Sequence, residues 1–172
     1  PYGPLRTTFY PFMVHTCLRL NECRTQRWDD IDLDRRWLTT TEDKSRRGDV
    51  IPISGEVVGL LTSWRPYSTG ELVFPKVPSH HTLAGDLERA GIRLKRGGFH
   101  AFRKTGITLR ANLGASHRDL AKLARHLNPA LTAEIYDRPD VEEIRQVAEM
   151  LKFRKGDTSD HPSGLVQTKE SR

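Results

Sequence analysis

The pattern of apolar positions predicts helices at the amino end of the chain and a small sheet directly after them. Residues 5–28 have a helical pattern with a break near Leu18 to Leu20. From Ile31 the pattern changes to alternation, which predicts short strands around Ile31 and Leu33 and from Trp37 to Thr41. A polar turn from Glu42 to Gly48 leads to a third strand, "DVIPI", at 49–53. Three short strands in succession predict an antiparallel sheet.

Helical spacing returns after the sheet. Ser54 is a predicted helix cap, and the helix that it opens carries apolar residues at helical spacing until Pro66 ends it. The segment 67–79, "YSTGELVFPKVPS", is predicted to be a surface loop. Further helices are predicted from the following segments: 81–92, His100 to about Gly114, 118–127 behind a Ser116–Asp119 cap, Pro129 to Tyr136, and a last one marked by Val141, Ile144, Ala148 and Leu151.

Together these elements predict a mainly α-helical α+β domain, in which a three-stranded antiparallel sheet packs beside a helical core. The length of 172 residues suits one domain with a hydrophobic core of its own. We expect that domain to cover residues 1–152. Residues 153–172 are polar, with Gly, Ser, Pro and mixed charge, and are predicted to be a disordered tail.

The charge of the chain favours a polyanionic partner. Lys and Arg number 28 against 22 Asp and Glu, for a formal charge of +6, and a Lys or Arg placed on a phosphate releases condensed counterions. Membrane insertion is not expected, because no apolar run approaches the roughly 18 residues that a spanning helix needs. Two cysteines make no disulfide framework, so a reducing cytoplasm is the expected compartment.

Metal chemistry is not expected from the acidic and thiol residues. Asp30, Asp32 and Asp34 resemble the start of a calcium loop, but Arg35 and Thr41 stand where that loop needs glycine and glutamate. Alternating aspartates on the solvent face of an edge strand are the better explanation. The chain has neither a zinc spacing nor a dinucleotide or nucleotide-triphosphate fingerprint.

Four cationic segments are the candidate chemistry instead. They contain Arg19 three residues before Glu22, Lys44 in the polar turn, His100 three residues before Arg103, and His126 ten residues before Tyr136. Residues three apart share a helix face, so His100 and Arg103 can reach one object. Each pair alone has an ordinary structural explanation: a surface ion pair, a helix cap, an aromatic at the edge of the core.

As an ordered set, the segments resemble the tyrosine recombinase family of the phage-integrase type. The carrying stretches are "TCLRLNECRTQRWDDIDLD" at 16–34, "KSRRGDVIP" at 44–52, "HAFRKT" at 100–105 and "RHLNPALTAEIY" at 125–136. The resemblance spans about residues 5 to 152. It implies the fold of DNA breaking-rejoining enzymes, in a protein of bacterial, phage or other mobile-element origin.

The resemblance also implies a role for each matching residue. Arg19 and Arg103 would hold the non-bridging oxygens of the scissile phosphate, while His100 would assist proton transfer and His126 would hydrogen-bond the developing charge. Lys44 would protonate the leaving 5′ oxygen, and Tyr136 would attack the phosphorus and stay joined to the 3′ end. Preorganised cations suit a phosphoryl transition state, and a phosphotyrosine conserves the broken bond, so no metal, ATP or other cofactor is implied.

The chain departs from the family pattern at two glycine positions and at its amino end. Cys17 and Arg125 stand where glycine is usual, and a backbone that needs positive φ there would be strained. The first motif begins almost at once, without the DNA-clamping domain that usually precedes it. An excised catalytic domain and a short gene both remain open.

Three functional hypotheses follow. The first is a site-specific recombinase acting on double-stranded DNA, which in this family assembles as a tetramer through the segment after the tyrosine, here residues 140–152. That segment could equally pack on its own domain. The others are a non-cleaving DNA-binding descendant and a type IB topoisomerase.

Overall fold

The computed structural model describes residues 3–40, 48–93, 98–125 and 141–152. In chain order its elements are α1 (Pro4–Thr16), α2 (Leu20–Thr25), the 3-10 turn η1 (Trp28–Asp30), β1 (Ile31–Asp32), β2 (Trp37–Thr39), β3 (Val50–Pro52), α3 (Gly55–Trp64), the 3-10 turn η2 (Arg65–Tyr67), α4 (His80–Arg89), α5 (His100–Asn112), α6 (His117–Ala124) and α8 (Val141–Glu149). The predicted fold class is therefore confirmed: helices dominate, beside one small antiparallel sheet.

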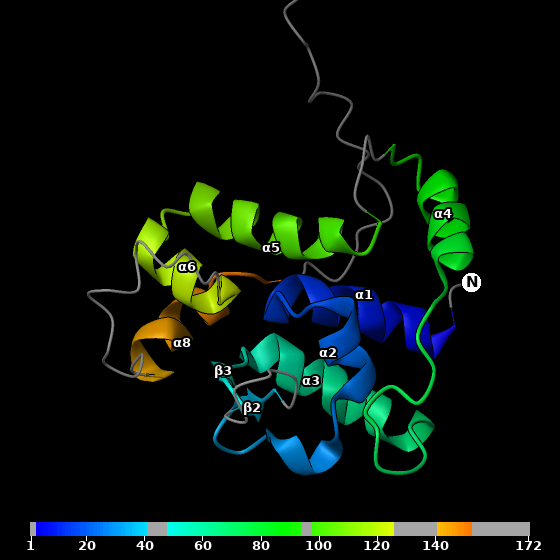
Figure 1. Cartoon of the computed structure of the whole chain (residues 1–172), viewed down its shortest axis with the longest axis horizontal. Coiled ribbons are helices and arrows are strands. Elements are labelled where there is room, and N and C mark those ends of the chain that lie inside the picture. Colours follow the sequence, from blue (N-terminus) through cyan, green and yellow to red (C-terminus); the bar gives the residue numbers. More distant parts are fainter. Residues whose placement is uncertain (1–2, 41–47, 94–97, 126–140, 153–172) are drawn as a thin grey trace, which may run out of the picture.

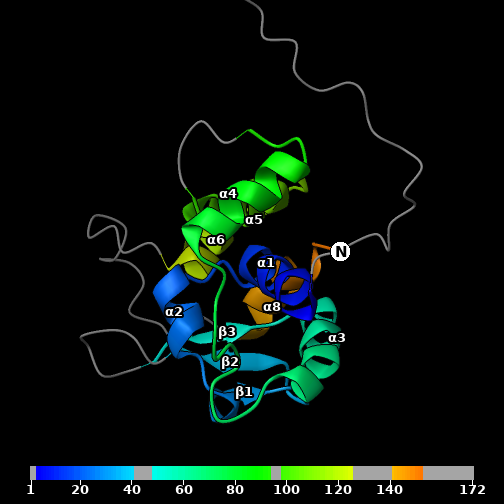
Figure 2. The same ribbon diagram turned by 90° about the vertical axis from the view of Figure 1, so that its right-hand side faces the viewer.

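Helix α1 lies in the middle of this arrangement. It packs against α5 on one side and α3 on the other, and Figures 1 and 2 show α5 above it and the sheet below. Helix α8 contacts both β3 and α6, so the last described helix returns to the sheet. Helix α8 therefore connects the sheet to α6.

The helix boundaries follow the predicted caps. The side chain of Ser54 accepts a hydrogen bond from the Val57 amide at the start of α3, and Ser116 does the same for Asp119 at the start of α6. The break predicted near Leu18 separates α1 from α2. The predicted helix from Pro129 to Tyr136 and the turn residues 42–47 lie outside the described residues.

The sheet has the order β1-β2-β3 with antiparallel neighbours, as predicted. Leu38 at the centre of β2 lies opposite Ile31 on one side and Ile51 on the other. Because side chains alternate across a strand, this register turns Leu38 and Ile51 into the core, where both are almost fully buried.

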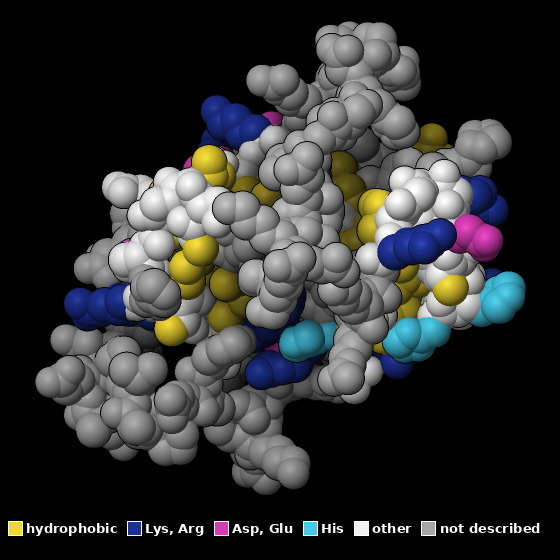
Figure 3. Space-filling view, turned by 90° about the horizontal axis from the view of Figure 1, so that it is seen from above, with side chains coloured by type: hydrophobic (Ala, Val, Ile, Leu, Met, Phe, Trp, Pro, Cys, Tyr) yellow, Lys and Arg dark blue, Asp and Glu magenta, His cyan; other side chains and the backbone are white. Residues whose placement is uncertain are grey.

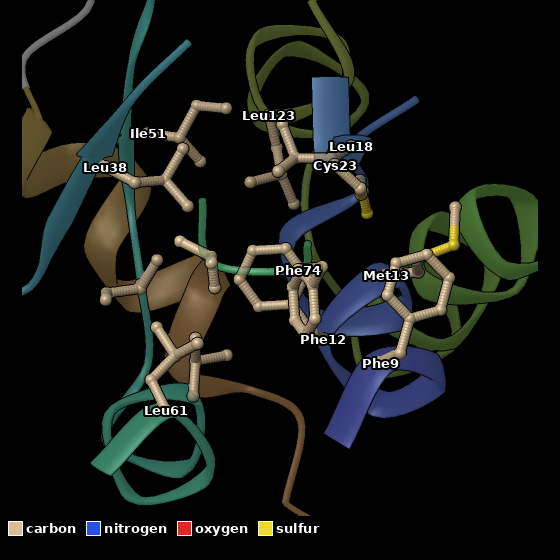
Figure 4. Packing of buried hydrophobic residues seen from close by; sticks show 14 of the residues in the cluster. Phe9, Phe12, Met13, Leu18, Cys23, Leu38, Ile51, Leu61, Phe74 and Leu123 are labelled. Carbon is tan, nitrogen blue, oxygen red and sulfur yellow. The ribbon is translucent and has the colours of Figure 1, made fainter. Parts of the chain in front are cut away.

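The core lies between the sheet, α1 and α3 (Figure 4). Its labelled side chains are Phe9, Phe12, Met13, Leu18, Cys23, Leu38, Ile51, Leu61, Phe74 and Leu123. The rings of Phe9 and Phe12 lie 5.0 and 5.1 Å from that of Phe74, centroid to centroid, an edge-on and a tilted contact.

One sequence prediction about this core is wrong. The segment 67–79 is not merely a surface loop, because Val73 and Phe74 are 0% and 1% exposed. The Val73 amide donates to the carbonyl of Gln26, and the Trp64 indole N–H donates to the Val73 carbonyl. These bonds satisfy the backbone of a loop whose apolar side chains complete the core.

The predicted division into a domain at 1–152 and a tail at 153–172 stays a prediction. The described residues pack around a single core that extends to Leu151, which is 7% exposed. The tail itself lies outside the described residues.

Candidate functional site

Helix α5 supplies the centre of the site. Its face toward α1 contains Arg103, Gly106 and Arg110, which the spacing of three and four residues places in one row. A Cβ atom on Gly106 would lie 2.1 Å from the carbonyl oxygen of Val14 and 2.9 Å from the sulfur of Cys17. The glycine therefore allows the two helices to approach closely, which brings Arg103 to the end of α1.

The guanidinium of Arg103 lies between two left-handed turns. It donates one hydrogen bond to the carbonyl of Cys17, where φ is 53°, and another to the carbonyl of Ala124, directly before Arg125, where φ is 48°. The first turn ends α1 and the second ends α6. Both departures from the family's usual glycine thus adopt the positive φ that a glycine would adopt without strain.

A buried carboxylate connects two further arginines. Glu22 accepts from the Arg19 backbone amide at 2.6 Å and from the Arg19 guanidinium at 3.0 Å. Its Oε2 also accepts from the Arg125 guanidinium at 2.6 Å. The side chains of Glu22 and Arg125 are 4% and 10% exposed, whereas that of Arg19 is 56% exposed. Arg19 therefore reaches solvent, while Arg125 holds the carboxylate from inside.

The electrostatics of this group favour an anion. Burial alone would raise the pKa of Glu22, but hydrogen bonds from Arg125 and Arg19 outweigh it, and the pKa falls below its ordinary value. Burial lowers the pKa of Arg103, and the charges of Arg125 and Arg19 lower it further. Two guanidinium groups bind the Glu22 carboxylate, and a third, that of Arg103, lies within its electrostatic reach, so the cluster carries excess positive charge.

His100 is the first residue of α5 and is exposed. It stands one turn before Arg103, as the sequence predicts. The structure thus places Arg103 within electrostatic reach of Arg19 and Glu22, and His100 at the start of the helix that carries Arg103.

The other three predicted site residues, Lys44, His126 and Tyr136, lie outside the described residues. Their neighbours in the chain are defined. Thr40 and Asp49 lie on either side of the segment that contains Lys44. The Thr40 amide donates a hydrogen bond of 3.0 Å to the Asp49 carbonyl. Arg125, the last described residue of its segment, directly precedes His126.

Arg110 is a structural residue that the sequence analysis did not single out. It is fully buried and donates to the carbonyls of His15 at 2.7 Å and Val147 at 2.7 Å, as well as to that of Ala148 at 3.3 Å. These carbonyls belong to the last turns of α1 and α8, where helix dipoles favour a cation. Its spacing of seven from Arg103 was the available signal, because it predicts a shared helix face.

Figure 3 shows the molecule from the side on which α5 lies. Lys, Arg and His side chains are more prominent than carboxylates on the described part of this face. Among the described residues, no group of three His, Cys, Asp or Glu is placed to hold a metal ion. In the same part of the chain, no helix is long and apolar enough to cross a membrane.

Comparison with models of known protein families shows which family the chain belongs to. The family model described as "Phage integrase family" matches residues 5–143. The chain belongs to the phage integrase family. The match includes every predicted site residue, and the resemblance that the four motifs indicate is confirmed. A comparison with curated protein sequences gave no match.

Solved structures of integrases and recombinases share the fold. The integrase from mycobacterium phage Brujita aligns with a TM-score of 0.70 at 21% identity, over 92% of this chain and 56% of that one. XerA recombinase aligns with a TM-score of 0.64 at 18% identity, over 84% and 57% of the two chains. XerH recombinase bound to its difH substrate aligns with a TM-score of 0.62 at 15% identity, over 80% and 48%. The chain therefore spans about half the length of these proteins.

Proposed function

We propose that this chain is the catalytic part of a tyrosine-type site-specific recombinase, which cuts and rejoins double-stranded DNA. The observation that carries the proposal is the proximity of Arg19 and Arg103, from separate motifs: Arg103 binds the carbonyl of Cys17, two residues before Arg19, and its pKa is lowered by burial and by the charge of Arg19. Membership of the phage integrase family supports it, as do the fold matches to integrases and recombinases. Integration or excision of a phage or other mobile element is the setting that this family suggests.

The arrangement of arginines suits phosphoryl transfer. A phosphoryl transition state spreads negative charge over its equatorial oxygens, and fixed guanidinium groups stabilise that charge without reorganising. Arg103 uses two of its N–H groups on carbonyls, and a guanidinium has five. The group is oriented before DNA arrives and keeps donors for a phosphate. Because Arg103 is 2% exposed, atoms that cover it must move before a phosphate touches it.

The remaining roles complete a strand transfer that balances without a cofactor. Tyr136 would attack the phosphorus while its phenol proton passes to a base, a transfer that His100 would assist. Lys44 would give a proton to the leaving 5′ oxygen, and His126 would hydrogen-bond the developing charge. A phenol has a pKa near 10 in water, so the cations must help to activate it. The phosphotyrosine keeps the energy of the broken bond, and neither metal nor ATP enters.

Double-stranded DNA is the proposed partner, and self-association as a tetramer on DNA through the carboxy-terminal helix is proposed with it. The printed description of XerH has that protein bound to its difH substrate. Here α8 packs on its own domain: Ile144, Val147 and Ala148 are buried, and Glu149 accepts from the Gly55 amide at 3.0 Å. Exchange of this helix between protomers would first have to break these contacts.

A covalent-adduct assay tests the activity. The protein and a Tyr136→Phe variant are incubated with nicked duplexes drawn from the DNA that flanks the gene, in the presence of a metal chelator and without ATP. We expect a denaturation-resistant protein–DNA band from the wild type alone. The variant differs by one hydroxyl oxygen, so it controls for binding and folding.

Three results would contradict the proposal. A band that persists in Tyr136→Phe would show that another residue is the nucleophile. DNA binding without a band in either protein would favour the non-cleaving descendant. Relaxation of supercoiled plasmid without exchange of strands between sites would indicate a topoisomerase instead.

A further inference from the structure

Arg125 has a backbone conformation that is unfavourable for any residue with a side chain. The residue ends α6 with φ at 48° and ψ at 45°, in the left-handed region that side chains rarely adopt. Glycine would take this conformation without strain and is the usual residue here in the family pattern. An arginine that is nevertheless kept in this turn needs a compensating contact.

That contact is the ion pair with Glu22. The Arg125 NH2 group lies 2.6 Å from Glu22 Oε2, and the two side chains are 10% and 4% exposed. Its Nε–H is buried and finds no partner among the described residues. The guanidinium is therefore held chiefly by one carboxylate, the same one that binds the backbone and the side chain of Arg19.

The ion pair joins two distant parts of the chain at the site. Glu22 lies in the first turn of α2, the helix that begins directly after Arg19. Arg125 lies at the end of α6, directly before His126, and the carbonyl of the preceding Ala124 accepts from Arg103. A shift of the Arg125 turn would thus move the Ala124 carbonyl, and with it the Arg103 guanidinium, relative to Arg19.

We propose that Arg125 is a positioning residue for strand cleavage: through Glu22 it fixes the end of α6, and with it the Ala124 carbonyl that orients Arg103, against Arg19. The inference rests on the proposed function, because its effect is on the cleavage step. It extends the set of site residues to a position where the family pattern has no side chain. Arg125 itself acts only through Glu22.

Arg125→Gly tests this with little risk to folding, because glycine removes the ion pair and relieves the backbone strain together. Arg36→Gly is a matched control. Arg36 also has positive φ, 58°, and an ion pair with a glutamate, Glu149 at 3.3 Å, but it is half exposed in the turn between β1 and β2. For each variant, the single-turnover rate of adduct formation at saturating DNA, the dissociation constant for the same DNA and the melting temperature are measured.

We expect Arg125→Gly to lower the cleavage rate on the order of 10- to 100-fold, the scale of a misplaced catalytic group. Its dissociation constant and melting temperature should stay close to those of Arg36→Gly, which should cleave as the wild type does. Arg125→Lys, which keeps the charge, should recover part of the rate. In a Glu22→Gln background, Arg125→Gly should lower the cleavage rate much less, because the ion pair through which Arg125 acts is already lost.

Every other outcome overturns the inference. A wild-type cleavage rate in Arg125→Gly would show that the ion pair is dispensable for cleavage. A fall in the cleavage rate that is matched by a fall in the melting temperature would show that the ion pair has only a structural role. If Arg125→Gly lowered the cleavage rate equally with and without Glu22→Gln, Arg125 would not act through Glu22. Failure of the proposed function is a separate result, because the wild type itself would then bind DNA and form no adduct.

Discussion

Arg103 and Arg110 lie seven residues apart on one face of α5, both are almost fully buried, and their surroundings differ. Arg103 donates to carbonyls at two left-handed turns, within the electrostatic reach of Arg19, Arg125 and Glu22. Among the described residues, Arg110 donates to backbone carbonyls and a thiol, chiefly in the last turns of α1 and α8. The first lies among other cations, and the second is held by helix ends.

The difference shows that burial of a charge does not by itself indicate chemistry. Arg110 neutralises the carbonyls that two helix ends leave unpaired, which is a structural task. Arg103 lies where cations repel one another, and burial together with Arg125 and Arg19 lowers its pKa. Excess positive charge that the fold does not balance is what points to an anionic substrate.

The strongest expected effect on folding is at Arg110. In Arg110→Met, several buried carbonyls lose their donor, and we expect the free energy of unfolding to fall by about 3 kcal/mol. Arg24→Met is the control, because Arg24 is exposed on α2 and should change stability by less than about 0.5 kcal/mol. Denaturant unfolding measures both, and equal losses would contradict the structural role of Arg110.

Arg103→Lys probes the other side of the comparison. The lysine keeps a charge but loses the fork that orients the group, so the rate of adduct formation should fall on the order of 100-fold. Unfolding free energy should fall less than in Arg110→Met. A rate loss no larger than the change in folded fraction would remove Arg103 from the site.

Gly106 lies between the two arginines and sets the distance of α5 from α1. In Gly106→Ala the new methyl group would meet the Val14 carbonyl at 2.1 Å, and we expect a loss of about 2 kcal/mol from overpacking. Gly59→Ala in α3, where a Cβ meets nothing within 4 Å, should stabilise the protein by up to about 1 kcal/mol. Denaturation of both variants by heat compares them directly, and destabilisation by both would contradict the close approach.

The smallest expected effect is a pH dependence near Arg110. Burial, and then the charge of Arg110, lower the pKa of His15 from 6.5 to about 4. Between these values the unfolded chain binds a proton that the folded chain does not, so stability falls as the pH falls. From about pH 7.5 to about pH 5.5 we expect a loss of about 1 kcal/mol. In His15→Asn this slope should be absent, and an NMR titration of His15 near its ordinary pKa would contradict the prediction.

Local sequence patterns predicted most of this fold, because helix caps and strand alternation depend on residues that are close together in the sequence. The hydroxyls of Ser54 and Ser116 bind amides three residues away, so the sequence placed the starts of α3 and α6. Alternation likewise predicted the strand that carries Leu38. The site prediction depended on ordered motifs and stays a prediction: Arg19 and Arg103 lie near each other, while Lys44, His126 and Tyr136 lie outside the described residues.

Predictions were weakest where the partners are distant in sequence. Phe74 lies in a segment rich in Gly, Pro and Ser, so its burial depends on α1 and α3, which the local pattern does not contain. Arg110 in an amphipathic helix resembles an exposed residue until the ends of α1 and α8 surround it. The Arg125–Glu22 pair spans 103 residues, and no spacing rule connects its members.

The long-range bonds of Arg110 also bear on how the chain folds as it is synthesised. The His15 carbonyl emerges 95 residues before this arginine, and the Val147 carbonyl emerges 37 residues after it. Until α8 leaves the ribosome, a cation enclosed by α1 and α5 lacks the acceptors that α8 brings. We therefore expect the nascent chain to complete its core only after nearly the whole domain has been made.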